Sequence, residues 1–287
     1  MYEIVTGSHG FCGTHLSDYL LKSGKTVIQL PRELLISPTK LKKFLSAYQP
    51  FRIYNLEAYG NLHGQDDKFE IYNAIVGKLL NLLEASKDLD CQGFITAGSS
   101  SEYGYKKEPM VETMMIEPTS LYGAAKAAAT HLAQAWALQF DKPIVVYRPA
   151  SITGIGEQAI HLIPTLIRSC MLHEAIQFIP EPTHDYINVM DVVRAVALLC
   201  ENAESYKGEI FNIGTGKQFT NQQVLDMVEK YSEHIANIVA LKNLRVFEKS
   251  ETWVVNSDKL RKLGWVPEIS FDRNIQDMVE ERDFNPY

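Results

Sequence analysis

The sequence predicts an α/β fold with a doubly wound parallel sheet and a smaller C-terminal lobe. Short apolar stretches alternate with amphipathic stretches of helical period from residue 2 to about residue 152. The first apolar stretch is followed by three glycines, Gly7, Gly10 and Gly13, and from about residue 155 the alternation loosens. Strands and helices that alternate at this spacing imply right-handed crossovers between parallel strands.

Apolar runs and helical periodicity place the individual elements. Strands are expected at residues 2–6, 25–30, 51–58, 91–100, 143–152 and 209–214. Helices are expected at residues 14–23, 37–49, 68–87, 122–140, 162–172, 190–203 and 220–231. Leu16, Tyr19 and Leu20 fall on one face of the first helix, which Gly24 ends. Thr220 is suited to cap the last helix.

Composition and charge exclude several classes of function. The 287 residues are 46% hydrophobic, and 28 basic against 35 acidic side chains give a net charge of −7. Such a chain does not attract phosphate backbones in general, so nucleic acid is not an expected partner. The four cysteines lie far apart and the histidines are not clustered, so neither a disulfide framework nor a metal site is expected. The chain starts on a strand and has no membrane-length apolar run, so we expect a cytoplasmic protein without membrane contact.

The glycine-rich segment "TGSHGFCG" predicts a dinucleotide site. Its Gly-x-x-Gly-x-x-Gly spacing lies between the first strand and the first helix, the context that a Rossmann-like fold requires. Glycines let the backbone approach a pyrophosphate, and the helix N-terminus offers unpaired N–H groups to the anion. We therefore expect Gly7, His9, Gly10, Phe11 and Gly13 to line the cofactor. A glycine-rich turn that binds nothing is the alternative.

Organisation and cofactor choice follow from this site. Residues 1–155 are expected to form the NAD(P)-binding portion, and residues 156–287 mainly the substrate-binding lobe, with about 184–213 returning to the first portion. The second strand lacks the usual terminal acid and ends in "QLPREL". Because Arg32 can pair with a 2′-phosphate, NADP(H) is favoured and NAD(H) is possible. Glu33 argues against it, and Arg32 could equally be a plain surface charge.

The segment "SSSEYG", residues 99–104, and the later Tyr122 and Lys126 are candidates for catalysis. Tyr-x-x-x-Lys places a phenol and an ammonium one helical turn apart on one face. A free tyrosine has a pKa near 10 and is a poor base, so a lysine beside it has a chemical purpose. A chain of this length contains that spacing about once by chance, so a buried tyrosine and a surface lysine remain the alternative.

With these motifs in order, the chain resembles the extended short-chain dehydrogenase/reductases, which are NAD(P)-dependent nucleotide-sugar epimerases, dehydratases and reductases. "TGSHGFCGTHL", "NLEA", "NAIVGKLLNLLEA", "AGSSSEYG", "YRPASITGIGE", "HDYINVMDVVRA", "GEIFNIGTG" and "SDKLRKLGWVPEIS" match motifs of that family over nearly the whole chain. The "SSSEYG" pattern looks closest to the GDP-4-keto-6-deoxymannose reductases. The family also dimerises through the helix that carries Tyr122 and Lys126, so a homodimer is expected.

The resemblance implies a role for each matching residue. Tyr122 would be the general acid/base, Lys126 would lower its pKa and hold the nicotinamide ribose, and Ser99 would hydrogen-bond the reacting oxygen, with Ser100 as the alternative. Asn73 would support a proton relay and Leu56 would lie beside the cofactor. The expected substrate-binding residues are Ser100, Ser101, Ser151, Arg168, His184 and Lys249. Three departures stand out: Glu57 replaces the usual alanine, Ser151 an asparagine, and His184 an arginine.

The expected reaction follows from the position of Ser101. In the family's dehydratases that position carries the carboxylate that removes and returns a sugar proton, and serine cannot do this. The leading interpretation is an NAD(P)H-dependent reductase of a nucleotide-diphospho-4-keto-6-deoxy sugar, with hydride delivered to C4 and Tyr122 as proton donor. The alternatives are a nucleotide-sugar C4 epimerase with bound NAD and, in another class, a non-catalytic nucleotide-sensing protein.

Overall fold

A six-stranded parallel sheet carries the site, in the order β2-β1-β3-β4-β5-β9. The computed structural model describes residues 1–62, 64–239 and 252–281. The strands of this sheet are β1 (Tyr2–Thr6), β2 (Thr26–Gln29), β3 (Phe51–Asn55), β4 (Cys91–Ala97), β5 (Ile144–Pro149) and β9 (Ile210–Ile213). The chain moves outward from β1 to β2 and then returns to β3 on the other side of β1. Ligands of such sheets bind outside the carboxyl ends of the strands at this reversal.

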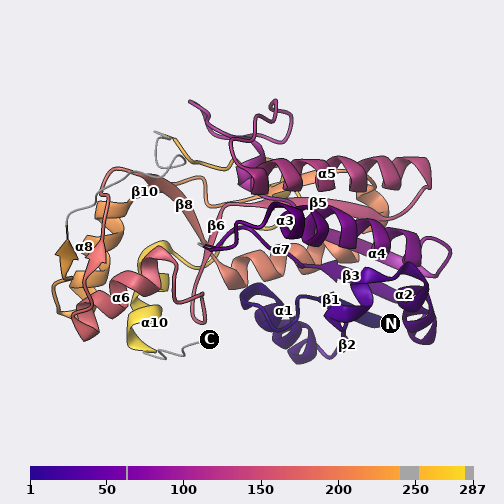
Figure 1. Cartoon of the computed structure of the whole chain (residues 1–287), viewed down its shortest axis with the longest axis horizontal. Helices are drawn as coiled ribbons and strands as arrows, with labels where there is room; N and C mark the ends of the chain where they lie inside the picture. The colour runs from indigo at the N-terminus through magenta and orange to yellow at the C-terminus, as the bar shows by residue number, and fades with distance from the viewer. Residues whose placement is uncertain (63, 240–251, 282–287) are drawn as a thin grey trace.

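Helices cover both faces of the sheet, which confirms the predicted doubly wound α/β fold (Figure 1). The helices α1 (Phe11–Lys22) and α7 (Val189–Glu201) cover one face; α2 (Pro38–Leu45), α4 (Lys78–Ser86) and α5 (Leu121–Gln139) cover the other. Side chains alternate along β1, so Val5 packs with the first pair of helices and Ile4 with the other three. Each fully buried aliphatic side chain of this kind contributes about 1.5–3 kcal/mol to folding.

The C-terminal part has its own small sheets and apolar core. Strands β6 (Ser151–Thr153), β8 (Thr183–Asn188) and β10 (Gln218–Thr220) form one sheet, and β7 (Ile176–Gln177) pairs with β11 (Ile238–Val239). The helices α6 (Leu162–Leu172), α8 (Asn221–Ser232) and α10 (Phe271–Glu280) pack around a third apolar cluster, and α9 (Asp258–Arg261) is a single turn. The boundary near residue 155 stays a prediction. The short 3-10 segments are η1 (Arg32–Ile36), η2 (Ser46–Tyr48), η4 (Ser100–Glu102) and η5 (Ala203–Tyr206).

Two local predictions were wrong. The single strand expected at residues 143–152 is two strands, because the chain leaves the large sheet after Pro149 and β6 pairs with β8 instead. Residues 183–188, for which no strand was expected, form β8, whose pairing partners β6 and β10 lie far from it in the sequence. The helix expected at 68–87 is confirmed over residues 68–86, but it consists of α3 (Lys68–Tyr72), a π-helical segment η3 (Asn73–Gly77) and α4.

A hydrogen-bond chain fixes the carboxyl ends of three neighbouring strands. The Thr6 hydroxyl donates to Asn55 Oδ1 at 2.8 Å, and Asn55 Nδ2 donates to Thr96 Oγ1 at 3.0 Å. Thr6 Oγ1 also accepts from the backbone N–H groups of Leu56 and Glu57 at 3.0 and 3.3 Å. The turns that follow β1 and β3 are therefore held against each other at the reversal of strand order.

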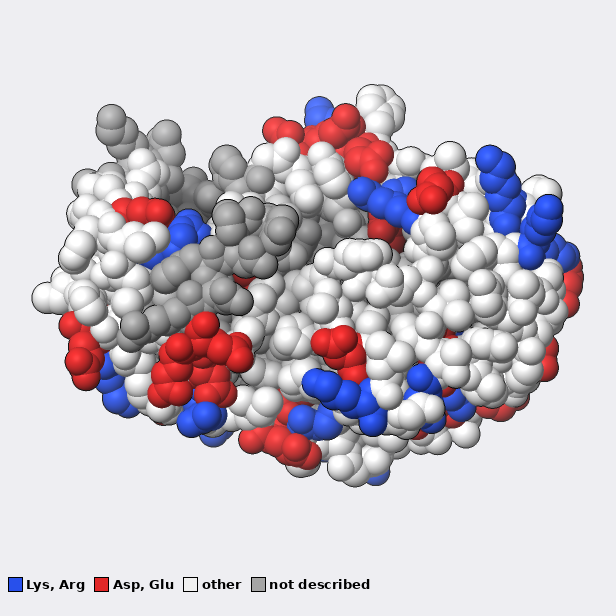
Figure 2. Space-filling model, turned by 90° about the horizontal axis from the view of Figure 1, so that it is seen from below, with Lys and Arg blue, Asp and Glu red and all other residues white. Residues whose placement is uncertain are grey.

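Two global features bear on partners. Within the described residues, none of the helices is both long and apolar enough to cross a membrane. On the face shown in Figure 2, Lys and Arg side chains are interspersed with Asp and Glu side chains and do not form one continuous basic surface.

Candidate active site

The glycine loop packs directly under the first turn of α1. Gly7 has a φ of +62°, and a Cβ on Gly13 would lie 2.0 Å from the carbonyl oxygen of Gly7. Only glycine at position 13 permits this contact between helix and loop. Gly10 caps α1 without a side-chain hydrogen bond, so the first N–H groups of the helix are left for another acceptor. An anion such as a pyrophosphate fits this donor set.

His9 and Phe11 lie in the same loop and have local partners. His9 Nδ1 lies 3.3 Å from Ser8 Oγ, and the Phe11 ring packs edge-on against His15 with ring centroids 5.5 Å apart. His15 Nε2 in turn hydrogen-bonds the carbonyl of Ile155 at 2.8 Å. The loop is therefore tied to the segment that follows β6.

Ser99 caps the short turn that follows β4. Its hydroxyl oxygen accepts from the backbone N–H of Ser101 at 3.1 Å, while the backbone N–H of Ser99 donates to Glu102 Oε1 at 2.8 Å. This reciprocal capping box fixes the turn. The Ser99 side chain lies close enough to Tyr122 to lower the pKa of its phenol, so the structure brings the predicted serine and tyrosine together.

Glu102 is fully buried and bound to structural partners. Its Oε2 accepts from Arg148 Nε at 2.8 Å, and its Oε1 accepts from the Thr130 hydroxyl at 3.0 Å. These contacts engage both oxygens of the carboxylate within the protein. With Ser101 one residue earlier, the turn Ser99–Glu102 offers no free carboxylate for removing a sugar proton.

Tyr122 and Lys126 lie on the first turns of α5, which Ser120 caps by accepting from the Gly123 N–H at 3.0 Å. Lys126 is 2% exposed and its Nζ lies 5.9 Å from the centroid of the Tyr122 ring. Burial raises the pKa of Tyr122 to about 12, and the hydrogen bond from Ser99 opposes that rise. Burial also lowers the pKa of Lys126 to about 8. At neutral pH the pair is therefore a protonated phenol beside a mainly protonated ammonium.

Arg32 is engaged in an ion pair and is not a free cation. Its Nε donates to Glu57 Oε1 at 2.7 Å, and its guanidinium lies 3.8 Å from Glu70. The same Glu57 oxygen accepts from Lys78 Nζ at 2.9 Å. Glu57 and Lys78 are buried, with side chains 8% and 7% exposed, whereas the Arg32 side chain is 60% exposed. Two basic and two acidic groups therefore balance at the carboxyl ends of β2 and β3.

Leu56 and Asn73 differ in exposure and in their distance from the glycine loop. Leu56 is half-buried and its carbonyl oxygen would lie 3.2 Å from a Cβ on Gly7, which places it directly against the glycine loop. Asn73 is exposed at the start of η3, and a Cβ on Gly77 would lie 2.8 Å from its Oδ1. Among the described residues no hydrogen bond links Asn73 to Tyr122 or Lys126, so its relay role stays a prediction.

The predicted substrate residues lie in different settings. Ser100 Oγ accepts from Trp253 Nε1 at 3.2 Å, and Ser151 begins β6. Arg168 pairs with Glu174 at 3.0 Å and donates to the carbonyl of Ala159. Lys249 lies outside the described residues. The substrate-binding roles of all these residues stay predictions.

His184 lies in β8 between two aromatic side chains. Its ring centroid is 5.6 Å from that of Tyr186 and 6.5 Å from that of Trp253. Burial lowers the pKa of His184 to about 4, so the ring is neutral at physiological pH. It cannot supply the positive charge that an arginine would bring to a diphosphate. Trp253 was not among the predicted site residues, because no local spacing indicates that it lies 153 positions away against Ser100.

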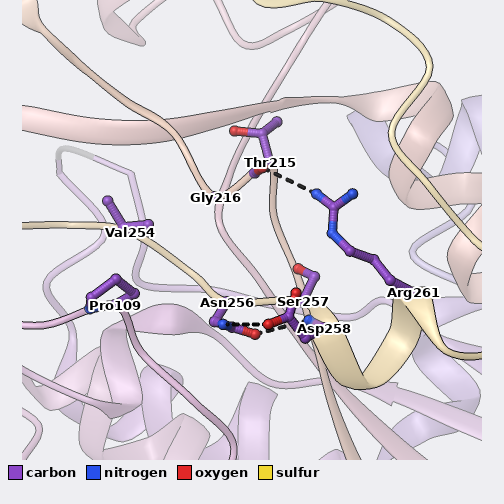
Figure 3. Close-up of a pocket in the computed structure, with 8 residues that line it drawn as sticks. All are labelled: Pro109, Thr215, Gly216, Val254, Asn256, Ser257, Asp258 and Arg261. Atoms are coloured by element: carbon purple, nitrogen blue, oxygen red, sulfur yellow. Dashed lines mark hydrogen bonds between the residues drawn. The ribbon is translucent and has the colours of Figure 1, made fainter.

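A pocket of about 280 Å³ is lined by none of the predicted catalytic residues (Figure 3). Its lining residues are Pro109, Thr215, Gly216, Val254, Asn256, Ser257, Asp258 and Arg261. Arg261 already donates to the carbonyl of Thr215 at 3.2 Å, and Asn256 donates to Asp258 at 3.0 Å. Its polar groups are therefore largely bound to one another. Among the described residues, no three His, Cys, Asp or Glu side chains gather as metal ligands.

The family model described as "NAD dependent epimerase/dehydratase family" matches residues 4–214. The chain belongs to this family. The finding confirms the family expected from the motifs, while the narrower likeness to 4-keto-6-deoxymannose reductases stays a prediction. The family comprises enzymes that act with a nicotinamide dinucleotide, and the glycine loop and the Ser99–Tyr122–Lys126 group fit that chemistry.

Individual relatives are distant. The UDP-glucose 4-epimerase of Corynebacterium glutamicum is 28% identical over 217 residues, which cover 69% of this chain and 65% of that protein. A dTDP-glucose 4,6-dehydratase of Haemophilus influenzae is 27% identical, and the match spans 55% of its length. In solved structures, the UDP-glucose 4-epimerase of Thermus thermophilus in complex with NAD has a TM-score of 0.86 at 23% identity, covering 98% of both chains. At this identity the structural likeness shows the fold alone.

Proposed function

We propose that this family member is a nucleotide-sugar C4 epimerase. The observation that carries the proposal is the Ser99–Tyr122–Lys126 group beside a turn whose carboxylate, Glu102, is bound to Arg148. Such a site can exchange a proton with one sugar hydroxyl, but its turn supplies no second acid/base for dehydration. Epimerases recur among the relatives, including the UDP-glucose and UDP-glucuronate 4-epimerases that resemble this chain.

The residues of the chain act on the C4 hydroxyl of the sugar. A bound nicotinamide supplies the acceptor and later the donor of hydride at C4. Tyr122 removes the hydroxyl proton and returns it, and Ser99 orients the reacting oxygen by hydrogen bonding. Burial raises the pKa of Tyr122, and Ser99 opposes that rise; in this proposal the positive charge of Lys126 also favours the ionised phenol. The unpaired N–H groups at the start of α1 hold the pyrophosphate.

A keto-sugar reductase is the second candidate. The same three residues serve it, and the serine-rich turn favours it because Ser101 replaces the dehydratase carboxylate. A structure of RMD from Pseudomonas aeruginosa complexed with NADPH has the same fold, with a TM-score of 0.86 at 22% identity. The two reactions differ in whether the dinucleotide is regenerated within one turnover or consumed.

A test separates these candidates. The purified chain is incubated with UDP-glucose or UDP-glucuronate, and products are resolved by anion-exchange chromatography. In parallel, NADPH and NADH absorbance is followed with GDP- and dTDP-4-keto-6-deoxy sugars. Epimer formation that Tyr122→Phe abolishes supports the epimerase, whereas consumption of reduced dinucleotide that depends on the keto sugar supports the reductase. No turnover of either kind, with folded protein that still binds a dinucleotide, supports the non-catalytic sensor.

We also propose a homodimer, because α5 carries an exposed apolar stripe. Leu121, Ala124, Ala128, Ala135 and Leu138 are exposed at helical spacing along one side of the helix, with the exposed His131 between Ala128 and Ala135. The neighbouring α3 adds Phe69 and Tyr72, which are 88% and 61% exposed. Small side chains let two helices approach closely, and a second copy would cover this surface.

A further inference from the structure

We propose that Glu57 determines which dinucleotide this chain binds, because its carboxylate accepts a hydrogen bond from the 2′-hydroxyl of the adenosine ribose. The chain is then selective for NAD(H) over NADP(H), and Arg32 positions Glu57 and does not bind a 2′-phosphate. The inference rests on the proposed function in that a nicotinamide dinucleotide is bound, but it does not depend on which reaction follows.

The Glu57 carboxylate lies near the strand ends where the adenosine ribose is expected to bind. In sheets of this topology the ribose carboxylate normally comes from the end of the second strand. There, Leu30 is apolar and 4% exposed, and Pro31 follows it, so the end of β2 supplies no carboxylate. The Glu57 backbone is bound to Thr6 at the end of β1, and its side chain reaches Arg32 directly after β2. A carboxylate from β3 therefore lies between the ends of all three strands.

Only one oxygen of the Glu57 carboxylate accepts hydrogen bonds from the neighbouring cations. Both cations bond the same oxygen, with Arg32 Nε at 2.7 Å and Lys78 Nζ at 2.9 Å from Oε1. Among the described residues Glu57 Oε2 has no hydrogen bond, and it is not among the fully buried unsatisfied atoms. The carboxylate is thus held in place through one oxygen, and the other can accept a hydroxyl.

The charges around Arg32 disfavour a 2′-phosphate. A 2′-phosphate near Arg32 would also lie near Glu57 and Glu70, which are already within 2.7 and 3.8 Å of the guanidinium. These two carboxylates already neutralise Arg32 and Lys78, so the cluster offers a 2′-phosphate no net positive charge. A neutral ribose hydroxyl needs no such charge. Buried Lys78 balances the charge of Glu57 and holds it in place, since neither group could be buried alone at low cost.

Dissociation constants of the purified chain for NAD⁺ and NADP⁺, measured by calorimetry after removal of bound nucleotide, test the proposal. The wild type is expected to bind NAD⁺ at least about tenfold more tightly than NADP⁺. In Glu57→Gln that ratio is expected to fall by about tenfold or more, because NAD⁺ loses an anionic acceptor and Arg32 becomes available to a phosphate. Glu33→Gln removes an exposed charge from the same segment as Arg32 and is expected to leave the ratio unchanged.

Glu57→Gln also leaves Lys78 buried without its carboxylate, so a second variant guards against misfolding. Glu57→Gln/Lys78→Met removes both buried charges together and is expected to lower the ratio in the same way. A wild type that prefers NADP⁺ overturns the proposal. So does a folded Glu57 variant with an unchanged ratio, or a folded wild type that binds neither dinucleotide. Selective NAD⁺ binding without epimerase turnover supports this proposal and counts only against the proposed reaction.

Discussion

Lys126 Nζ donates a 2.8 Å hydrogen bond to the carbonyl oxygen of Ala97, at the end of the strand that leads to Ser99. The ammonium is thereby fixed between β4 and α5, on the same helix face as Tyr122. Its Nζ lies 5.9 Å from the centroid of the Tyr122 ring, and we expect it to act on the phenol through its charge. On this proposal, the charge state of Lys126 affects how readily Tyr122 ionises.

We expect kcat/KM, which reports the ionisation of groups in the free enzyme, to decline above about pH 8. The pKa of Lys126 is lowered to about 8 by burial, so its positive charge is lost as pH rises through that value. Tyr122, whose pKa is raised to about 12, is not ionised by solvent in this range and loses its electrostatic support. The pH profile of kcat/KM measures this decline. A rate that stays level to pH 10 would contradict the control of Tyr122 by Lys126.

The same pKa predicts how stability changes with pH. Because burial lowers the folded pKa of Lys126 below that of an unfolded lysine, near 10.4, the unfolded chain binds more protons between about pH 8 and 10.4. The contribution of Lys126 to stability therefore rises with pH in that window. Thermal unfolding of wild type and Lys126→Met at pH 7 and pH 9.5 checks this. The stability of the wild type minus that of Lys126→Met should be larger at pH 9.5 than at pH 7. A smaller difference at pH 9.5 would contradict the prediction.

Glu102→Gln is expected to lower stability by about 3–5 kcal/mol, because it leaves Arg148 buried without its carboxylate. Denaturant unfolding measures the loss. Glu108→Gln, an exposed position six residues further along, is the matched control and should change stability by less than about 0.5 kcal/mol. If Glu102→Gln kept full stability but lost turnover, Glu102 would be a catalytic residue and not a structural one.

Ala128→Glu is expected to prevent the proposed homodimer from forming. It places a charge in the middle of the exposed apolar stripe on α5, where a second copy would have to bury it. Light scattering after size-exclusion chromatography gives the mass. Thr39→Glu, at a position on α2 away from that stripe, serves as control and should leave the mass unchanged. A wild type that is monomeric at micromolar concentration would refute the homodimer.

Local sequence patterns predicted the parallel sheet and the placement of Tyr122 and Lys126 on one helix face, because both depend on short-range periodicity. In these cases the physical cause lies within a few residues of the feature.

Features that depend on distant partners could not be predicted. Arg32 was expected to meet a phosphate, yet Glu57, 25 residues away, binds it after the chain folds. The contact of Trp253 with Ser100 joins residues 153 positions apart. The π-helical turn of η3 lies within an otherwise regular helical period, which gives no local signal for it.

The most direct test of the central claim is a proton NMR measurement of the chain with UDP-glucose in D₂O, with Tyr122→Phe in parallel. Epimerisation through transient oxidation at C4 returns the same hydrogen to that carbon. The account predicts a C4 epimer without deuterium at C4, and a rate at least about 100-fold lower in Tyr122→Phe. Deuterium at C4 of the product, or an undiminished rate in Tyr122→Phe, would contradict it.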